Sequence, residues 1–207
     1  MTTVYLVRHS EGFKSLEGIF KTNDSIQLIN EKSPLSYNGE KLAEKIANNK
    51  EFSDIDVVWC SNYARTMSTA KYFAINSDLK VNLDDRLGER IHGINTWKEL
   101  SVDFEERQFL DKTYKIGFGE NQVEVRNRME EVFDEILNAN LNKRIVIVGH
   151  STAFAFLLKK WCVVNYDKPY MFNGKVFFDG KWNYCETFKL EFNDNKELIN
   201  IKNINIY

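Results

Sequence analysis

Two arginines and two histidines in this chain have types and neighbours that suit one kind of chemistry. Arg8 and His9 stand side by side near the start, Arg65 follows later, and His150 comes directly after Gly149, in a chain with only three histidines. A guanidinium group binds two phosphate oxygens at once, and a neutral imidazole nitrogen attacks phosphorus as a nucleophile. Because a transferring phosphoryl group spreads negative charge over its oxygens, fixed cations around it supply much of the catalysis. These residue types therefore suit phosphoryl transfer, provided that the fold brings them together.

Short apolar runs that predict buried strands lie directly before these residues. The runs are Thr3–Arg8, Ile55–Cys60 and Arg144–Gly149, and each is short and apolar, as expected of a strand covered on both faces. The first run ends in Arg-His, the second is followed by Ser61 with an arginine within the next turn, and the third by His150. The carboxyl ends of parallel strands meet at one edge of a sheet, where ligands bind and helix N-termini add backbone donors. The sequence therefore predicts that the basic side chains converge at one sheet edge.

Patterns elsewhere in the chain indicate the fold class. Ser36–Asn48 begins with a serine N-cap and places apolar residues on one helical face. Phe188–Phe192 alternates apolar with other residues ahead of an Asn-Asp-Asn turn. Strands that alternate with helices predict an α/β fold, with a mostly parallel central sheet flanked by helices on both faces and an antiparallel C-terminal edge hairpin. Gly12–Ser33 and Tyr166–Asn183 are expected to be irregular insertions.

Composition narrows the class of protein and its partners. A length of 207 residues predicts a single domain over residues 1–207, and a net charge of -2 gives no global field to attract nucleic acid or an acidic membrane. The first residues lack the pattern of a signal peptide, and no apolar run approaches the length of a membrane span, so we expect a cytoplasmic location and no membrane partner. Three widely spaced cysteines without a Cys-x-x-Cys pair predict reduced thiols, and we expect no metal and no other cofactor.

Six segments resemble the motifs of a known family, in the family's order. The family is the histidine phosphatase superfamily, whose members share the phosphoglycerate mutase-like fold. Each match alone is weak, but six in order over most of the chain are specific. The segments are VRHSEG, PLSYNGEKLA, SNYARTMSTA, LGERIHG, GFGENQVEVRNR and VIVGHSTAF.

The resemblance implies a role for each of the basic residues and for one glutamate. His9 would be the nucleophile that becomes phosphorylated, while Arg8, Arg65 and His150 would hold the phosphoryl oxygens. Glu89 would protonate the leaving oxygen and then help to activate water. On this resemblance we expect a metal-independent phosphomonoesterase that acts on a small-molecule phosphomonoester through a phosphohistidine on His9.

Other residues near these motifs are weaker candidates. Glu11 is a rival for the acid, because it lies close to the same predicted sheet edge. Ser10, Arg90 and His92 are candidate substrate contacts, and His92 is also interpreted as a supporting residue in a loop. Ser10 stands where the family has a glycine, so its side chain must fit beside the phosphate.

Three alternatives remain open on the sequence. A phosphoglycerate mutase would use the same residues, although the short stretch between Glu89 and Glu120 would leave the site less covered than in mutases and so favour hydrolysis by water. A serine hydrolase would use Ser151 in Gly149–Ala153 as its nucleophile, but no histidine follows that serine and the final glycine of the motif is absent. A non-catalytic binding module on the same fold is the third alternative, and the presence of His9 and both arginines gives it no support.

Overall fold

The computed structural model describes residues 1–14 and 24–204. Within them, eight strands form two sheets. The strands are β1 (Thr2–Arg8), β2 (Val57–Cys60), β3 (Val81–Leu83), β4 (Arg144–Gly149), β5 (Tyr170–Phe172), β6 (Lys175–Phe178), β7 (Thr187–Phe192) and β8 (Leu198–Asn203). The larger sheet has the order β3-β2-β4-β1-β7-β8, and β5 pairs with β6 in the smaller one. The first four strands of the larger sheet are mutually parallel, whereas β7 and β8 are antiparallel to their neighbours.

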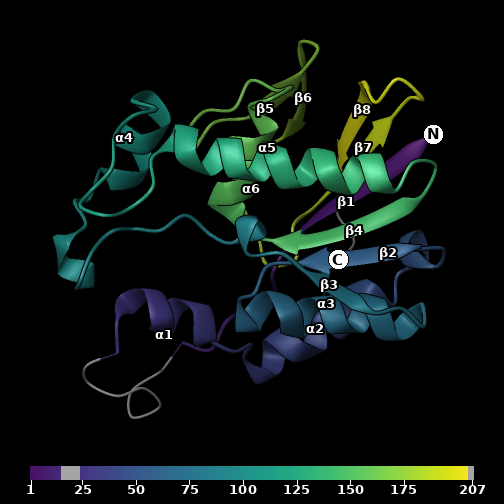
Figure 1. The fold of residues 1–207 in the computed structure, drawn as a ribbon, viewed down its shortest axis with the longest axis horizontal. Helices are drawn as coiled ribbons and strands as arrows, with labels where there is room; N and C mark the ends of the chain where they lie inside the picture. The colour runs from purple at the N-terminus through teal and green to yellow at the C-terminus, as the bar shows by residue number, and fades with distance from the viewer. Residues whose placement is uncertain (15–23, 205–207) are drawn as a thin grey trace.

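Helices cover both faces of the larger sheet (Figure 1). The α-helices are α1 (Ile26–Lys32), α2 (Tyr37–Ala47), α3 (Ala64–Asn76), α4 (Phe104–Leu110), α5 (Gln122–Ala139) and α6 (Ser151–Leu158), and the short 3-10 helices are η1 (Lys50–Phe52), η2 (Asp85–Leu87) and η3 (Trp97–Glu99). Helices α2 and α3 lie on one face, and α5 and α6 lie on the other. The predicted fold class, with its parallel centre, two helical layers and antiparallel edge hairpin, is therefore confirmed.

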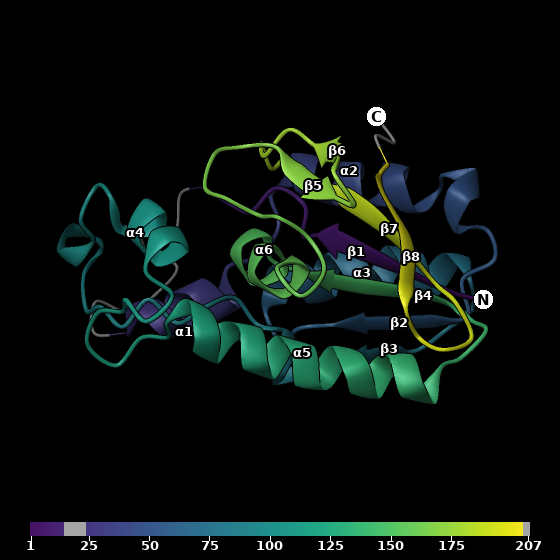
Figure 2. The same cartoon turned by 90° about the horizontal axis from the view of Figure 1, so that it is seen from above.

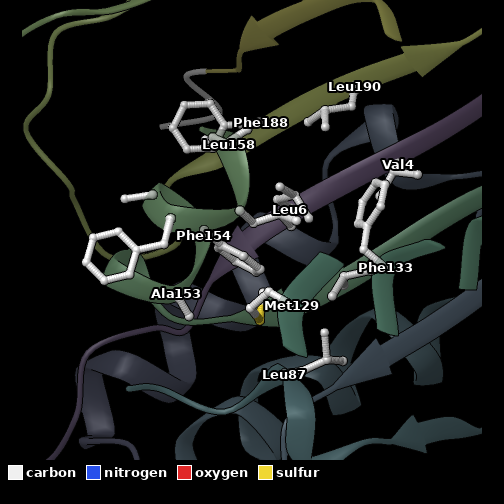
Figure 3. Close-up of a cluster of buried hydrophobic side chains, with 14 of the residues drawn as sticks. Val4, Leu6, Leu87, Met129, Phe133, Ala153, Phe154, Leu158, Phe188 and Leu190 are labelled. Atoms are coloured by element: carbon white, nitrogen blue, oxygen red, sulfur yellow. The ribbon is translucent and has the colours of Figure 1, made fainter. Parts of the chain in front are cut away.

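Alternate residues of β1 build the two halves of the core. Val4 and Leu6 pack with Met129 and Phe133 on the α5 and α6 side, as Figure 3 shows, and Tyr5, like Val7, packs toward α2 and α3. Side chains of a strand point alternately to opposite faces, so a strand covered on both sides must be apolar throughout. This requirement explains why the sequence of β1 reads as an unbroken apolar run.

Two predicted elements match the structure closely. The run Arg144–Gly149 is β4 without change. Ser36 is the N-cap of α2, and its hydroxyl accepts a hydrogen bond of 2.9 Å from the backbone N–H of Gly39. The predicted range also ends at Asn48, which is the C-cap of this helix. Both elements carry strong local signals, one in its apolar run and one in its cap.

The two predicted irregular insertions are in part regular, and that prediction was wrong. Gly12–Ser33 contains α1, whose N-cap Ser25 accepts from the N–H of Leu28; residues 15–23 of this stretch lie outside the described residues. Tyr166–Asn183 contains the β5–β6 hairpin. Its two-residue connection, Asn173-Gly174, has positive φ at both positions, which is the usual requirement of a tight hairpin turn.

The carboxyl ends of the parallel strands point toward one side of the molecule. Figure 1 shows α1 and α4 on that side, and Figure 2 again places α4 beyond the ends of the strands. The segment between β3 and α5 supplies η2, η3 and α4. In the parts of the chain that the structure describes, no helix is both long and apolar enough to cross a membrane.

Candidate active site

Neighbouring strands bring the predicted basic residues together. Strand β4 lies between β1 and β2 and is parallel to both, and the N–H of His9 donates to the carbonyl of Gly149 at 2.9 Å. The imidazole rings of His9 and His150 have their centroids 5.3 Å apart. Arg65, in the first turn of α3, places Nη2 3.3 Å from Nδ1 of His150. The carboxyl edge of the sheet therefore holds two imidazoles and two guanidinium groups, since Arg8 ends β1.

The ring of His9 is held in one protonation state. Its Nδ1 lies 2.7 Å from the carbonyl oxygen of Ser10, and because a carbonyl oxygen only accepts, Nδ1 carries the ring proton. Burial lowers the pKa of His9 well below its usual value, and the positive charges of Arg65 and then Arg8 lower it further. The imidazole is therefore neutral near pH 7, and its Nε2 has a free lone pair.

His150 is fully buried and is oriented by hydroxyl groups. Its Nε2 lies 2.9 Å from Oγ of Ser61, which in turn lies 2.7 Å from Oγ1 of Thr66. Burial lowers the pKa of His150 well below its usual value, and the positive charge of Arg65 lowers it further. No role for Ser61 or Thr66 was predicted, although both stand in the SNYARTMSTA segment, at the end of a strand and in the helix after it.

Main-chain carbonyls hold one arm of each arginine. Nη1 of Arg8 donates to the carbonyl of Trp182 at 2.8 Å, and Nη1 of Arg65 donates to the carbonyl of Asn30 at 2.5 Å. Burial lowers the pKa of both arginines, and the charge of Glu89 opposes this effect. The Nε–H of Arg8 is buried and has no hydrogen-bond partner among the described residues. An anion that reaches this donor would satisfy it.

The side chain of Glu89 contacts the first turn of α6. Its Oε1 accepts hydrogen bonds from the backbone N–H groups of Arg90 at 3.0 Å and Ala153 at 3.2 Å. The N-terminal end of a helix favours negative charge, so this contact holds one carboxyl oxygen in place. The rival Glu11 accepts from the hydroxyl of Ser36 at 3.1 Å, at the start of α2. The two glutamates are therefore tied to the ends of different helices.

The three candidate substrate contacts are bonded to protein groups. The hydroxyl of Ser10 is buried and donates to the carbonyl of Gly39 at 2.7 Å. Arg90 is 2% exposed and forms an ion pair with Glu105 of α4. Nε2 of His92 lies 3.3 Å from Nη2 of Arg90. Burial lowers the pKa of His92, and the positive charge of Arg90 lowers it further. A substrate contact by any of them stays a prediction.

Two cavities are lined by neighbours of the basic residues, but none of Arg8, His9, Arg65 and His150 lines either of them. A cavity of about 280 Å³ is lined by Ser151, which follows His150, and by Trp182, whose carbonyl binds Arg8. One of about 270 Å³ is lined by Glu89 and by Tyr63, whose ring contacts that of His150. The first is lined by Glu105, Phe109, Ser151, Thr152, Ala155, Tyr166, Asp167, Tyr170, Gly180 and Trp182. Within residues 1–14 and 24–204, no three His, Cys, Asp or Glu side chains are grouped so that they could hold a metal ion.

Relatives and solved structures are similar to this chain over most of its length. Phosphoserine phosphatase 1 of Hydrogenobacter thermophilus is 28% identical over 73% of this chain and 72% of its own. A protein named "Probable phosphoglycerate mutase GpmB" from Yersinia enterocolitica is 30% identical over 76% of this chain and 74% of its own.

Solved structures share the fold at lower identity. A mycobacterial glucosyl-3-phosphoglycerate phosphatase in complex with inorganic phosphate has a TM-score of 0.70 and 19% identity, covering 98% of this chain and 95% of that one. A phosphoserine phosphatase variant of Entamoeba histolytica in complex with phosphoserine has a TM-score of 0.66 and 19% identity, covering 98% and 97%. The family model of the histidine phosphatase superfamily (branch 1) matches residues 4–204. The fold, the converging basic residues and this match together show that the chain belongs to the histidine phosphatase superfamily.

Proposed function

We propose that residues 1–207 form one catalytic domain that hydrolyses a small-molecule phosphomonoester through a phosphohistidine on His9. The family and its relatives support a phosphatase or mutase activity. The observation that carries the proposal is the free Nε2 of a neutral His9, beside Arg8, Arg65 and His150. A nucleophilic nitrogen among fixed donors is what attack on phosphorus requires.

In the first step, the phosphoryl group moves from substrate to enzyme. Nε2 of His9 attacks phosphorus, and the bond from phosphorus to the leaving oxygen breaks. Arg8 and Arg65 hold the phosphoryl oxygens, and His150 donates to one of them from Nδ1. Oε1 of Glu89 is occupied by two N–H groups, so Oε2 is the atom that gives its proton to the leaving oxygen. The carbonyl of Ser10 stabilises the positive charge on the phosphorylated ring through Nδ1–H.

In the second step, water replaces the alcohol. Glu89, now a carboxylate, takes a proton from the water while its oxygen attacks phosphorus. The bond between phosphorus and Nε2 of His9 breaks, and inorganic phosphate leaves. The imidazole is again neutral, and Glu89 has regained the proton that it gave to the leaving oxygen.

A phosphoglycerate mutase is the second candidate, because relatives bearing that name reach 30% identity. It would pass the phosphoryl group back to a second hydroxyl instead of to water. Phosphoserine and 3-phosphoglycerate, the latter with and without a bisphosphoglycerate primer, are therefore the first substrates to assay. Release of inorganic phosphate without the primer supports the proposed phosphatase. Isomerisation of 3-phosphoglycerate that needs the primer would show that the protein is a mutase instead.

The experiment that tests the proposal is rapid quenching with phosphorus-labelled substrate. The quench is alkaline because phosphohistidine is acid-labile, and peptide mapping then locates the label. We expect label on the peptide that contains His9, and no label in His9→Ala. Label on Ser10, Ser151 or His150 would overturn the assignment of roles even if phosphate were released.

A further inference from the structure

One side chain of α5 binds the main chain on which Glu89 stands. Arg128 donates from Nη1 to the carbonyl oxygens of Arg86 at 2.6 Å and Gly88 at 2.9 Å. It also donates from Nη2 to the carbonyl oxygen of Glu89 itself, at 3.2 Å. The segment that follows η2, from residue 88 to residue 96, contains neither helix nor strand. Its position therefore depends on contacts of this kind rather than on regular backbone pairing.

Glu120, which lies just ahead of α5, fixes the same guanidinium group. Nε and Nη2 of Arg128 donate to its two carboxyl oxygens at 2.7 and 2.8 Å. Oε2 of Glu120 also accepts the backbone N–H of Ile91 at 2.9 Å, and the N–H of Glu120 donates to the carbonyl of Ile91 at 2.8 Å. The pair therefore holds the chain on both sides of Glu89, at residues 86–89 and at residue 91.

All five N–H donors of Arg128 are used in this arrangement. Three go to carbonyls of the Glu89 segment and two go to Glu120. Arginine presents five donors in a planar fork, whereas lysine has three on a flexible stem. Both side chains of the pair are more than four-fifths buried, with 19% and 17% exposed. Lysine would keep the charge and much of the apolar stem but lose the geometry.

We propose that Arg128, held by Glu120, is the positioning residue for the proton donor Glu89. The inference rests on the proposed function, because Arg128 and Glu120 can affect the reaction in this way only if Glu89 is the proton donor. A displacement of about 1 Å at a reacting group can cost on the order of 100-fold in rate. Arg128 touches no reacting atom in this scheme and acts only by keeping the carboxyl group in reach of the leaving oxygen.

The loss of activity in a variant should depend on the leaving group if Arg128 positions Glu89, and should not depend on it if Arg128 only stabilises the fold. A general acid matters most when the departing alkoxide is basic, and little when it is a stable phenolate. Arg128→Lys should therefore lower kcat/KM about 10- to 100-fold for an alkyl phosphate. For p-nitrophenyl phosphate the loss should stay within about threefold, because nitrophenolate needs little protonation. Glu120→Gln, which removes the charge that fixes the guanidinium, should show the same preference in weaker form.

The experiment compares Arg128→Lys in two backgrounds, wild type and Glu89→Gln. If Arg128 acts through Glu89, adding Arg128→Lys to Glu89→Gln should change kcat/KM for the alkyl phosphate by no more than about twofold. The matched control is Arg126→Met on the same helix, where Arg126 pairs with Glu130 and its side chain is 38% exposed. This variant should leave kcat/KM for both substrates unchanged. Inhibition by inorganic phosphate, with an unchanged inhibition constant, shows that each variant is folded around an intact phosphate site.

The outcomes separate this inference from the proposed function. Equal losses for alkyl and aryl substrates in Arg128→Lys, or a loss that persists in the Glu89→Gln background, would overturn the positioning role alone. If Glu89→Gln itself shows no dependence on the leaving group, Glu89 is not the proton donor and the inference falls with it. If His9 carries no label in the wild type, the proposed function fails first.

Discussion

The two ring nitrogens of His150 face partners of different kinds. Nδ1 faces the guanidinium of Arg65, which only donates, and Nε2 faces the hydroxyl of Ser61, which both donates and accepts. In these contacts Nδ1 therefore accepts, and Nε2 carries the ring proton and donates to Ser61. When a phosphoryl group takes the guanidinium of Arg65 instead, Ser61 can donate to Nε2 and leave the ring proton on Nδ1, where it faces a phosphoryl oxygen. Ser61 therefore allows a neutral His150 to act as a donor in the proposed chemistry.

Replacement of this hydroxyl should be costly. We expect Ser61→Ala to lower the free energy of unfolding by about 1 to 3 kcal/mol, because Nε2 of the fully buried His150 loses its partner. The affinity for inorganic phosphate should fall as well, because the ring loses the hydroxyl that orients it and that can donate to Nε2. Urea unfolding and phosphate inhibition measure the two effects, with Ser53→Ala, whose hydroxyl bonds the carbonyl of Lys50 at the surface, as the control. Unchanged stability and unchanged inhibition together would contradict this role.

Replacement of Ser151 tests whether the protein is a phosphatase or a serine hydrolase. Its neighbour His150 is engaged by Ser61 and Arg65, and the side chain of Ser151 lines the cavity beside Trp182. Ser151→Ala should therefore keep phosphatase activity within about threefold, as expected when no group of the chemistry is removed. The measurement is hydrolysis of p-nitrophenyl phosphate beside that of p-nitrophenyl acetate. An esterase activity that disappears in Ser151→Ala would favour the hydrolase instead.

At the scale of elements, helix α2 packs directly against the loop that carries the nucleophile. A Cβ atom at Gly39 would overlap the carbonyl oxygen of Glu11, two residues beyond His9. The carbonyl of Gly39 also accepts the hydroxyl of Ser10. A glycine is therefore required where the helix approaches this backbone.

This contact gives a prediction for α2. Gly39→Ala should lower the free energy of unfolding by about 1 to 3 kcal/mol, because the added methyl group forces the helix away from the loop. Activity should fall with it, since the loop holds His9. Gly12→Ala is the matched control: among residues 1–14 and 24–204, a Cβ there meets only the carbonyl oxygen of Pro34 at 3.8 Å, an ordinary contact. Thermal unfolding and kcat/KM of the two variants test the difference, and equal behaviour would contradict it.

Elements with strong local signals could be predicted from the sequence, and those stabilised by distant contacts could not. Strand β4 and helix α2 were predicted with accurate boundaries because each has a continuous apolar pattern or a cap. Strand β3 was missed: it has three residues, and its last two, Asn82 and Leu83, are exposed, so neither an apolar run nor an alternation marks it. The β5–β6 hairpin was missed because its packing partner, Phe188 on β7, lies outside its own sequence.

The candidate site shows the same division at the scale of the whole molecule. Arg8, His9, Arg65 and His150 could be predicted to meet because each ends a parallel strand, follows one or lies in the first turn of the next helix. The partners of these residues could not be predicted. The carbonyl of Trp182, which accepts a hydrogen bond from Arg8, is a main-chain group. Every residue type has a main-chain carbonyl, so the sequence cannot indicate such a partner. The side chain of Arg128 reaches back over about forty residues, a distance that no local pattern encodes.

The two histidines of the candidate site make the stability of the whole molecule depend on pH. In the folded state the pKa values of His9 and His150 lie well below the usual value, whereas in the unfolded chain both take up protons near pH 6.5. Below about pH 6.5 the unfolded state therefore binds more protons, and the free energy of unfolding falls as the pH falls, by up to about 1.4 kcal/mol per pH unit for each histidine.

Urea unfolding at pH 7.5 and 5.5 measures this dependence. The wild type should be less stable at the lower pH, and His150→Asn should lose part of the difference because one of the two neutral rings is gone. Ser53→Ala, at the surface, should keep the full difference. A wild type equally stable at both values would show that the two rings take up protons in the folded state as readily as in the unfolded chain.

The place of β4 in the sheet has a consequence for how the molecule is made. Among the strands that the structure describes, it alone links the β2–β3 pair to the β1–β7–β8 set in the larger sheet, yet it occupies residues 144–149. A growing chain on the ribosome therefore exposes β1 and β2 with open edges until more than two thirds of it has been synthesised. Both edges are apolar and able to pair with other chains during that interval. Synthesis of β4 covers the two edges that face each other, one on β1 and one on β2, and the same event delivers His150 to His9. The other edge of β1 stays open until β7, at Thr187–Phe192, has been made.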